Sequence, residues 1–159
     1  MVEKEQRIRY QRSRFSTRLP TAISYTRSHF WLAERSPGLW RVGFTKFATR
    51  MLGELVEFEF KLAADNRVEV GATIGWIEGF KAMADLYCVV DGRFVASNPE
   101  LDDDVSLLGR EPYGRGWLYE AEGSPESNAV DVHTYIGILD ATIDKMLEKQ
   151  SGEKASDPS

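Results

Sequence analysis

The hydrophobic and polar positions of this 159-residue chain alternate mostly with the period of β-strands. Residues 56–60, Val-Glu-Phe-Glu-Phe, alternate strictly, which is typical of a strand with one buried face. Residues 29–34 and 39–44 are predicted to be two strands, joined by a turn that contains Pro37 and Gly38. Further short strands are predicted at 72–78, 86–90, 93–96 and 117–121. Closely spaced short strands with turn residues between them predict a small β-sandwich or barrel.

The pattern changes to the helical period in two places. Thr45 can cap a short helix over residues 45–51, and Gly53 follows as its stop signal. A longer helix is predicted over 131–149, where apolar residues recur at the helical period. We expect this apolar stripe to pack on the sheet, although a helix that binds a partner is an alternative interpretation.

Charge and composition exclude several function classes. The chain has 20 Lys and Arg against 25 Asp and Glu, so its net charge of -5 argues against a nucleic-acid partner. No apolar stretch is long enough to span a bilayer, and we therefore expect a cytoplasmic domain that is not attached to a membrane. Cys88 is the single cysteine and there are two histidines, so no metal site is predicted. Asp102, Asp103 and Asp104 lack an ordered ligand spacing and are interpreted as a solvated acidic loop.

Composition divides the chain into three parts. Residues 1–20 hold six basic side chains against two acidic ones, and they are predicted to be a flexible basic arm. A docking arm for an acidic partner is the alternative for this segment. Residues 21–149 are predicted to form one domain that includes the C-terminal helix, because no linker divides them. Residues 150–159 contain no apolar residue larger than alanine and are predicted to be a disordered tail.

One motif stands apart from this pattern. Residues 78–82, Glu-Gly-Phe-Lys-Ala, connect two apolar strands, and Asp85 follows three residues later. Lys81 is the only lysine between Lys61 and Lys145. A lone lysine on a hairpin is usually a solvated charge, so the residue type alone carries no functional prediction.

The motif resembles the lipoylation site of the glycine cleavage H-protein family, which usually reads Glu-Ser-Val-Lys-Ala with the same later Asp. Five further blocks, over roughly residues 25–147, resemble that family in order and spacing. They are Tyr25-Thr26 with His29 and Trp31, Val42-Gly43-Phe44-Thr45, Leu52-Gly53-Glu54-Leu55-Val56, Asn98-Pro99-Glu100-Leu101, and Pro112-Tyr113-Gly114-Arg115-Gly116-Trp117-Leu118.

The resemblance implies a mainly β fold, a flattened barrel or sandwich of the lipoyl and biotinyl type, with lipoate in amide linkage to Lys81. In such a hairpin Gly79 would permit the tight turn, and Glu78 and Asp85 would stabilise it or be recognised by the lipoate ligase. The resemblance implies a carrier with no catalytic residue of its own. Its expected partners are a lipoate ligase, dihydrolipoamide dehydrogenase, and either the glycine cleavage enzymes or a heterodisulfide-reductase-like complex.

The departures from the family pattern concern the group that the lipoyl arm carries. Phe30 stands where the family usually has Glu, Phe47 and Phe80 add apolar bulk in matching blocks, and Lys46 replaces a frequent acid. We expect Phe30, Phe47 and Phe80 to line the cleft that shelters the arm. A cationic aminomethyl group would lack a counter-charge in such a cleft. The favoured interpretation is therefore the branch that resembles the lipoate-binding proteins of heterodisulfide-reductase-like sulfur oxidation.

Three alternatives remain open at this point. The first is the glycine cleavage H protein itself, which carries the aminomethyl group of glycine. The second is an unmodified scaffold, and the third is a relay that passes lipoate to other proteins.

Overall fold

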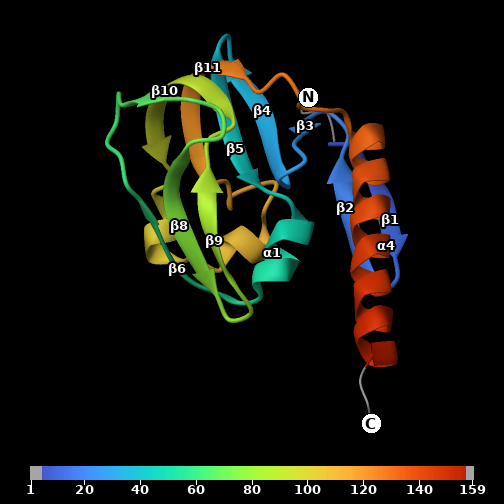
Figure 1. Ribbon diagram of the computed structural model, residues 1–159. Helices are drawn as coiled ribbons and strands as arrows, with labels where there is room; N and C mark the ends of the chain where they lie inside the picture. Colours follow the sequence, from blue (N-terminus) through green and yellow to red (C-terminus); the bar gives the residue numbers. More distant parts are fainter. Residues whose placement is uncertain (1–4, 157–159) are drawn as a thin grey trace.

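The chain folds mainly into β-strands, with three short helices and one long helix at its end (Figure 1). The computed structural model describes residues 5–156. The strands are β1 (Arg7–Arg12), β2 (Phe15–Pro20), β3 (Ser24–Tyr25), β4 (Phe30–Ser36), β5 (Leu39–Phe44), β6 (Leu55–Phe60), β7 (Arg67–Val68), β8 (Thr73–Gly79), β9 (Met83–Tyr87), β10 (Val90–Ser97) and β11 (Tyr119–Pro125). The helices are α1 (Lys46–Leu52), α2 (Glu100–Asp103), α3 (Leu107–Arg110) and α4 (Val132–Ser156).

Two sheets form the sandwich that the sequence predicts. A six-stranded sheet has the order β3-β4-β5-β11-β10-β7, and a three-stranded sheet has the order β6-β8-β9. Both are antiparallel throughout, as expected when short consecutive strands are joined by tight turns. The predicted fold class, mainly β with a short and a C-terminal helix, is confirmed.

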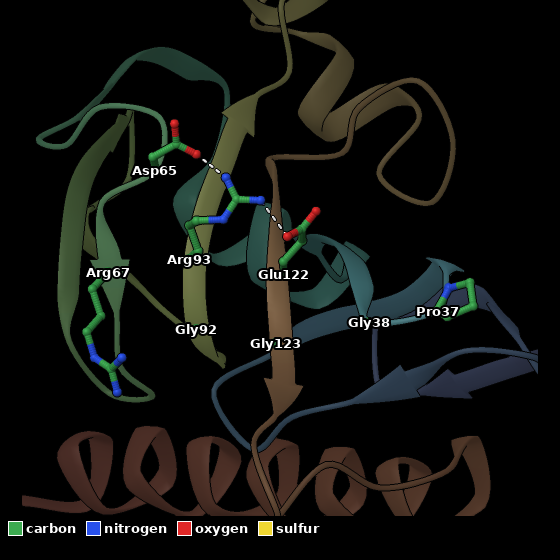
Figure 2. A pocket seen from close by; sticks show the side chains of 8 residues that line it. All are labelled: Pro37, Gly38, Asp65, Arg67, Gly92, Arg93, Glu122 and Gly123. Atoms are coloured by element: carbon green, nitrogen blue, oxygen red, sulfur yellow. Dashed lines mark hydrogen bonds and ion pairs between the residues drawn. The ribbon is translucent and has the colours of Figure 1, made fainter.

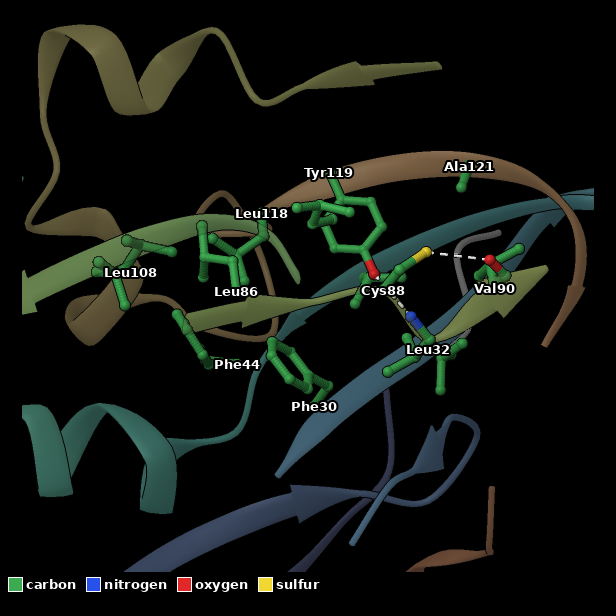
Figure 3. Close-up of a cluster of buried hydrophobic side chains, with 14 of the residues drawn as sticks. Phe30, Leu32, Phe44, Leu86, Cys88, Val90, Leu108, Leu118, Tyr119 and Ala121 are labelled. Atoms are coloured by element: carbon green, nitrogen blue, oxygen red, sulfur yellow. Dashed lines mark hydrogen bonds between the residues drawn. The ribbon is translucent and has the colours of Figure 1, made fainter. Parts of the chain in front are cut away.

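The main core lies between these sheets, and Figure 3 shows part of it. Ile77 and Leu86 of the smaller sheet are fully buried against Val42 and Tyr119 of the larger one. Phe30 is only 2% exposed, and its ring stacks on Phe44 with the centroids 5.1 Å apart. Burial of these large side chains supplies the dominant favourable term in folding.

Helix α1 begins and ends as its sequence predicts. The Thr45 side chain accepts a hydrogen bond from the backbone N–H of Ala48, which caps the first turn. Gly53 follows the last residue with a φ of 78°, a left-handed conformation that glycine adopts at no steric cost. Helix α1 therefore ends in a sharp turn that leads directly into β6.

The N-terminal segment differs from the flexible arm that composition predicts. Within the described residues, β1 and β2 form an antiparallel hairpin that packs along α4 (Figure 1). Tyr10, Phe15 and Leu19 are buried in a second core with α4. Each of these residues directly follows a basic residue, so the local pattern predicts a solvated segment. Residues 1–4 of the expected arm lie outside the described part of the chain.

Helix α4 is longer than the sequence predicts, and its apolar stripe packs on the β1–β2 hairpin as well as on the larger sheet. It continues to Ser156, so residues 150–156 are helical rather than a disordered tail; 157–159 lie outside the described residues. Its buried face packs mainly on the β1–β2 hairpin and on Tyr25, whose ring stacks on Tyr135 at 4.6 Å. Arg12 of the hairpin also forms an ion pair with Asp144 at 2.7 Å. The hairpin and the helix thus form one layer beside the sandwich.

The strand predicted at 86–90 is divided in the structure. Strand β9 ends at Tyr87, and β10 begins at Val90 and runs through the Gly92 that suggested a turn. Gly92 faces Gly123 of β11, where a side chain on either residue would collide with a backbone carbonyl oxygen about 1.9 Å away. Gly92 therefore serves close strand contact rather than chain reversal.

We predict that Phe15→Ala destabilises the protein by about 3 kcal/mol, because it removes a buried ring that packs edge-on against Phe47. Chemical denaturation measures this change. The exposed neighbour Ser16→Ala should shift the unfolding free energy by less than about 0.5 kcal/mol. An unchanged midpoint in Phe15→Ala would return residues 7–20 to the flexible arm of the sequence-based prediction.

Candidate functional site

Lys81 lies at the apex of the β8–β9 hairpin. Glu78 and Met83 form the last strand pair, and the Gly79 N–H donates to the Ala82 carbonyl at 2.9 Å, so Phe80 and Lys81 form the connection. Lys81 is exposed, and no hydrogen bond or ion pair of its ammonium group is found within residues 5–156. The side chain is therefore free to be acylated.

The apex backbone is docked on the end of α1. The Lys81 N–H donates to the carbonyl of Leu52 at 2.9 Å, and the Phe80 N–H donates to the carbonyl of Glu54 at 2.9 Å. Leu52 is the last residue of α1, so its carbonyl has no partner within the helix and the hairpin supplies one. The exposed lysine is thereby held by its own main chain.

Gly79 is required for this contact rather than for the turn. Its φ is not in the left-handed region, but a Cβ at this position would lie 2.1 Å from the Leu52 carbonyl oxygen. The family resemblance predicts that Gly79 permits the tight turn, and the structure gives a different physical reason for the glycine. A close approach of two backbones is the reason for the glycine.

Glu78 and Asp85 share the outer face of the β6-β8-β9 sheet. Glu78 pairs with Met83 and Trp76 pairs with Asp85, so the two acids are diagonal neighbours on one face. Glu57 of β6 lies opposite Glu78 on the same face. The hairpin that bears Lys81 therefore presents an acidic surface, and whether a ligase reads it stays a prediction.

An apolar cleft of about 260 Å³ opens on one side of α1. Most of its lining residues are aromatic, belong to β9 or the connection before it, or lie on one face of α1. They are Ser28, His29, Phe30, Phe44, Phe47, Ala48, Met51, Leu52, Ala82, Met83, Ala84, Asp85 and Tyr87. Phe30 and Phe47 are among the lining residues, whereas Phe80 is not and is 76% exposed. Phe30 contributes little surface, because most of its ring belongs to the main core (Figure 3).

Asp85 affects the charge at this cleft. The sequence predicts no counter-charge there, because Phe30 replaces the usual glutamate. In the structure Asp85 of β9 is one of the lining residues, and its side chain belongs to the outer face of the β6-β8-β9 sheet. A cationic group in the cleft would therefore have an acidic neighbour.

His29 closes the same cleft from the side of α4. It has a φ of 70°, its Nδ1 and the Tyr135 hydroxyl are hydrogen-bonded at 2.8 Å, and its ring lies 4.7 Å from that of Phe47. Burial lowers the pKa of His29 to about 4, because the imidazolium would lose its hydration. The sequence could not predict this position in the cleft, because Tyr135 lies 106 residues away along the chain.

A second cleft, of about 440 Å³, lies on the opposite side of α1 and is cationic. It is lined by four basic residues and one acidic residue, which are Lys46, Arg50, Lys81, Arg110 and Glu54. This cationic cleft could not be predicted from the sequence, because its basic residues come from α1, α3 and the hairpin and are separated along the chain. The lining residues include Lys81, whereas those of the apolar cleft do not.

Other features of the molecule lack the chemistry of a site. An open hollow of about 630 Å³ lies near Gly38, in the turn between β4 and β5 (Figure 2). This turn is at the opposite end of the sandwich from the apex of the β8–β9 hairpin (Figure 1). Arg93 in this hollow is paired with both Asp65 and Glu122, so its charge is already matched. Cys88 is buried, and burial raises the pKa of its thiol.

The described part of the chain lacks both a metal-binding cluster and a membrane-spanning helix. Residues 5–156 contain no group of three or more His, Cys, Asp or Glu arranged to hold a metal ion. None of the helices within that range has a stretch that is both long and apolar enough to cross a bilayer.

Comparison with known proteins gives one consistent family. A family model described as glycine cleavage H-protein matches residues 23–137. The chain belongs to the glycine cleavage H-protein family. A glycine cleavage system H protein of Thermobifida fusca is 39% identical over 108 residues, which cover 68% of this chain and 84% of the relative. One from Corynebacterium jeikeium is 34% identical over 122 residues, covering 75% and 95% of the two chains.

A solved structure supports the same assignment. The crystal structure of a glycine cleavage system H protein from Mycobacterium marinum matches with a TM-score of 0.68 at 31% identity. The match covers 75% of this chain and 97% of that one. The β1–β2 hairpin and the part of α4 after residue 137 lie outside the family match. These two segments pack against each other in one layer beside the sandwich.

We predict that acidification from pH 7 to pH 5 weakens the fold partly through His29. The unfolded chain binds a proton on this histidine below about pH 6.5, whereas the folded chain does so only near pH 4. Unfolding therefore takes up a proton in this window, and the free energy of unfolding should fall by roughly 1–2 kcal/mol.

Urea denaturation at several pH values tests this prediction. His29→Asn removes the titrating group, and Asn tolerates a left-handed φ better than most residues. The variant should lose this part of the pH dependence. Equal slopes in wild type and variant between pH 7 and pH 5 would show that the buried histidine is not the cause.

Proposed function

We propose that this chain is a lipoyl carrier of the glycine cleavage system, with lipoate attached in amide linkage to Lys81. The observation that supports the proposal most is an exposed lysine at a hairpin apex, with its main chain docked on α1 and a cleft on either side of that helix. H-protein relatives that match most of their own length support the same function.

The residues around Lys81 fit this cofactor. The ammonium is exposed and unpaired within the described residues, so a ligase can reach it, and the apolar cleft of about 260 Å³ is next to the hairpin. Lipoate supplies a dithiolane that carries a group or electrons by thiol–disulfide exchange. The protein holds the attachment point, offers a water-poor cleft through Phe47 and Met83, and needs no catalytic residue of its own.

The aminomethyl group of glycine is the load that the family relationship favours. Asp85 is the one acidic residue among those that line the apolar cleft, and its carboxylate would offset part of the desolvation cost of a cation docked beside it. His29 is held neutral at physiological pH by burial and would not repel that cation. On this account the partners are a lipoate ligase, dihydrolipoamide dehydrogenase and the other glycine cleavage enzymes, and the cytoplasmic location stays a prediction.

Sulfur oxidation remains a second candidate, although none of the relatives named above supports it. The observation in its favour is the cationic cleft beside Lys81, which suits an anionic load better than a cationic one. The heterodisulfide-reductase-like partner of the sequence-based prediction depends on this candidate alone.

Lipoylation tests the shared part of both candidates. Protein incubated with lipoate, ATP and a lipoate ligase should gain one lipoyl amide, and Lys81→Arg should gain none. Lys61→Arg and Lys145→Arg are matched controls that should be modified fully. Lys81→Arg should change the free energy of unfolding by less than about 0.5 kcal/mol, because the side chain is exposed. Lipoyl found on another lysine would refute the assignment.

A reconstituted glycine cleavage assay with the partner enzymes then separates the two candidates. The lipoylated wild type should support glycine decarboxylation, and the lipoylated Asp85→Asn variant should do so more weakly. Lipoylated protein that is inactive in this assay, with partner enzymes active on a known H protein, would contradict the glycine cleavage role.

A further inference from the structure

Helix α1 separates two clefts of opposite character. The helix face formed by Lys46, Thr49, Arg50 and the following Gly53 lines the cationic cleft. The opposite face, which includes Phe47 and Met51, lines the apolar cleft that contains Asp85. The hairpin apex is hydrogen-bonded to the end of this helix, so an arm attached to Lys81 starts at the boundary between the two clefts.

The Lys81 side chain already lies on the cationic side. A Cβ added to Gly53 would be 2.8 Å from Lys81 Cγ and 3.2 Å from Lys81 Cδ, so the lysine stem runs over this glycine. Lys81 lines the cationic cleft and does not line the apolar one. Any group carried at the end of this side chain is therefore directed first toward the cationic cleft.

The charges in this cleft are only partly matched. Lys46 and Arg50 are four residues apart on one helix face, where like charges repel each other. Lys46 donates to the Gly109 carbonyl at 2.6 Å, and Arg110 is paired with Asp104 at 2.5 Å. Among residues 5–151, whose side chains are described, Arg50 has no hydrogen-bond or ion-pair partner.

Acylation of Lys81 removes one of the four positive charges that line this cleft. Three cationic residues and the acidic Glu54 then line the cleft, which keeps a net positive charge. An anion that binds there would relieve the repulsion between Lys46 and Arg50. The cleft of about 440 Å³ is large enough to admit a carboxylate or sulfonate group.

We propose that the cationic cleft binds an oxyanion carried at the end of the lipoyl arm, so that the charge of the load decides on which side of α1 the arm rests. An anionic load rests against Arg50 and Lys46, and a cationic load rests in the apolar cleft near Asp85. This inference depends on the proposed lipoylation of Lys81, but not on which partner enzymes use the arm.

Three arms of similar size and different charge test the proposal. The lipoylated protein is reduced with a phosphine, and its two thiolates displace halide from iodoacetate, iodoacetamide or 2-bromoethylamine. The products are stable thioethers that are anionic, neutral and cationic, and each reaction releases halide. Cys88 is 1% exposed and should stay unmodified, which intact mass verifies.

Amide chemical shifts report where each arm rests. Relative to the neutral arm, the anionic arm should shift the amides of Arg50, Gly109 and Arg110, and the cationic arm should shift those of Ala84 and Asp85. Arg50→Gln should lower the bound-to-free ratio of the anionic arm about two- to fivefold, as expected for a partly exposed ion pair. High salt should lower it as well. Arg67→Gln, in the hollow at the far end of the sandwich, is the matched control and should have no effect.

The outcomes distinguish this inference from the proposed function. Absence of lipoyl mass on Lys81 would refute the lipoyl carrier itself. A lipoylated protein whose anionic and neutral arms shift the same amides equally would overturn only the cleft assignment. So would an Arg50→Gln effect no larger than that of Arg67→Gln. Equal shifts from free sulfate, added to unlipoylated protein at the same concentration as the arm, would assign the cleft to free oxyanions instead of the arm.

Discussion

The hydrogen bond from the Lys81 main chain to the carbonyl of Leu52 is the contact on which the rest of the site depends. It joins the apex of a hairpin in the smaller sheet to the end of the helix that follows the larger sheet. Two glycines make it possible: Gly79 lets the two backbones approach, and Gly53 turns the chain and leaves room for the lysine stem. The contact fixes the backbone of a residue whose side chain must stay free. That combination is what a carrier with a swinging arm requires.

The same contact gives α1 its role as a divider. Since the helix ends at the hairpin, both of its exposed faces lie next to the root of the arm, and each face carries different chemistry. The apolar face offers aromatic surface with Asp85 at its edge, and the polar face offers Lys46 and Arg50. Sheltering a reactive group requires a place that excludes water, and the charge of that place selects which groups are sheltered. The layer formed by the β1–β2 hairpin and α4 supports helix α1, because Phe15 packs on Phe47 at 5.5 Å between ring centroids.

Features that depend on neighbours in the chain could be predicted from the sequence. The strict alternation at 56–60, the Thr45 cap with its Gly53 stop, and the motif around Lys81 all describe local structure. Features that depend on residues far apart could not. The N-terminal hairpin looked like a solvated arm because its three buried residues find their partners on α4, more than a hundred positions away. The cationic cleft is assembled from three separate elements. The acidic residue that lines the apolar cleft, Asp85, comes from β9, whereas the family pattern has a glutamate at the position of Phe30.

Hydrogen exchange of the Lys81 amide in Gly79→Ala tests the central contact most directly. The added methyl group would lie 2.1 Å from the Leu52 carbonyl oxygen, so the hairpin apex must move off the helix. Gly137→Ala, in α4 with nothing within 4 Å of the added methyl, is the matched control and should leave the amide protected. We predict that the Lys81 amide is protected in wild type and exchanges freely in Gly79→Ala. The free energy of unfolding of this variant should fall by about 1–3 kcal/mol. Equal protection in Gly79→Ala and wild type would contradict it.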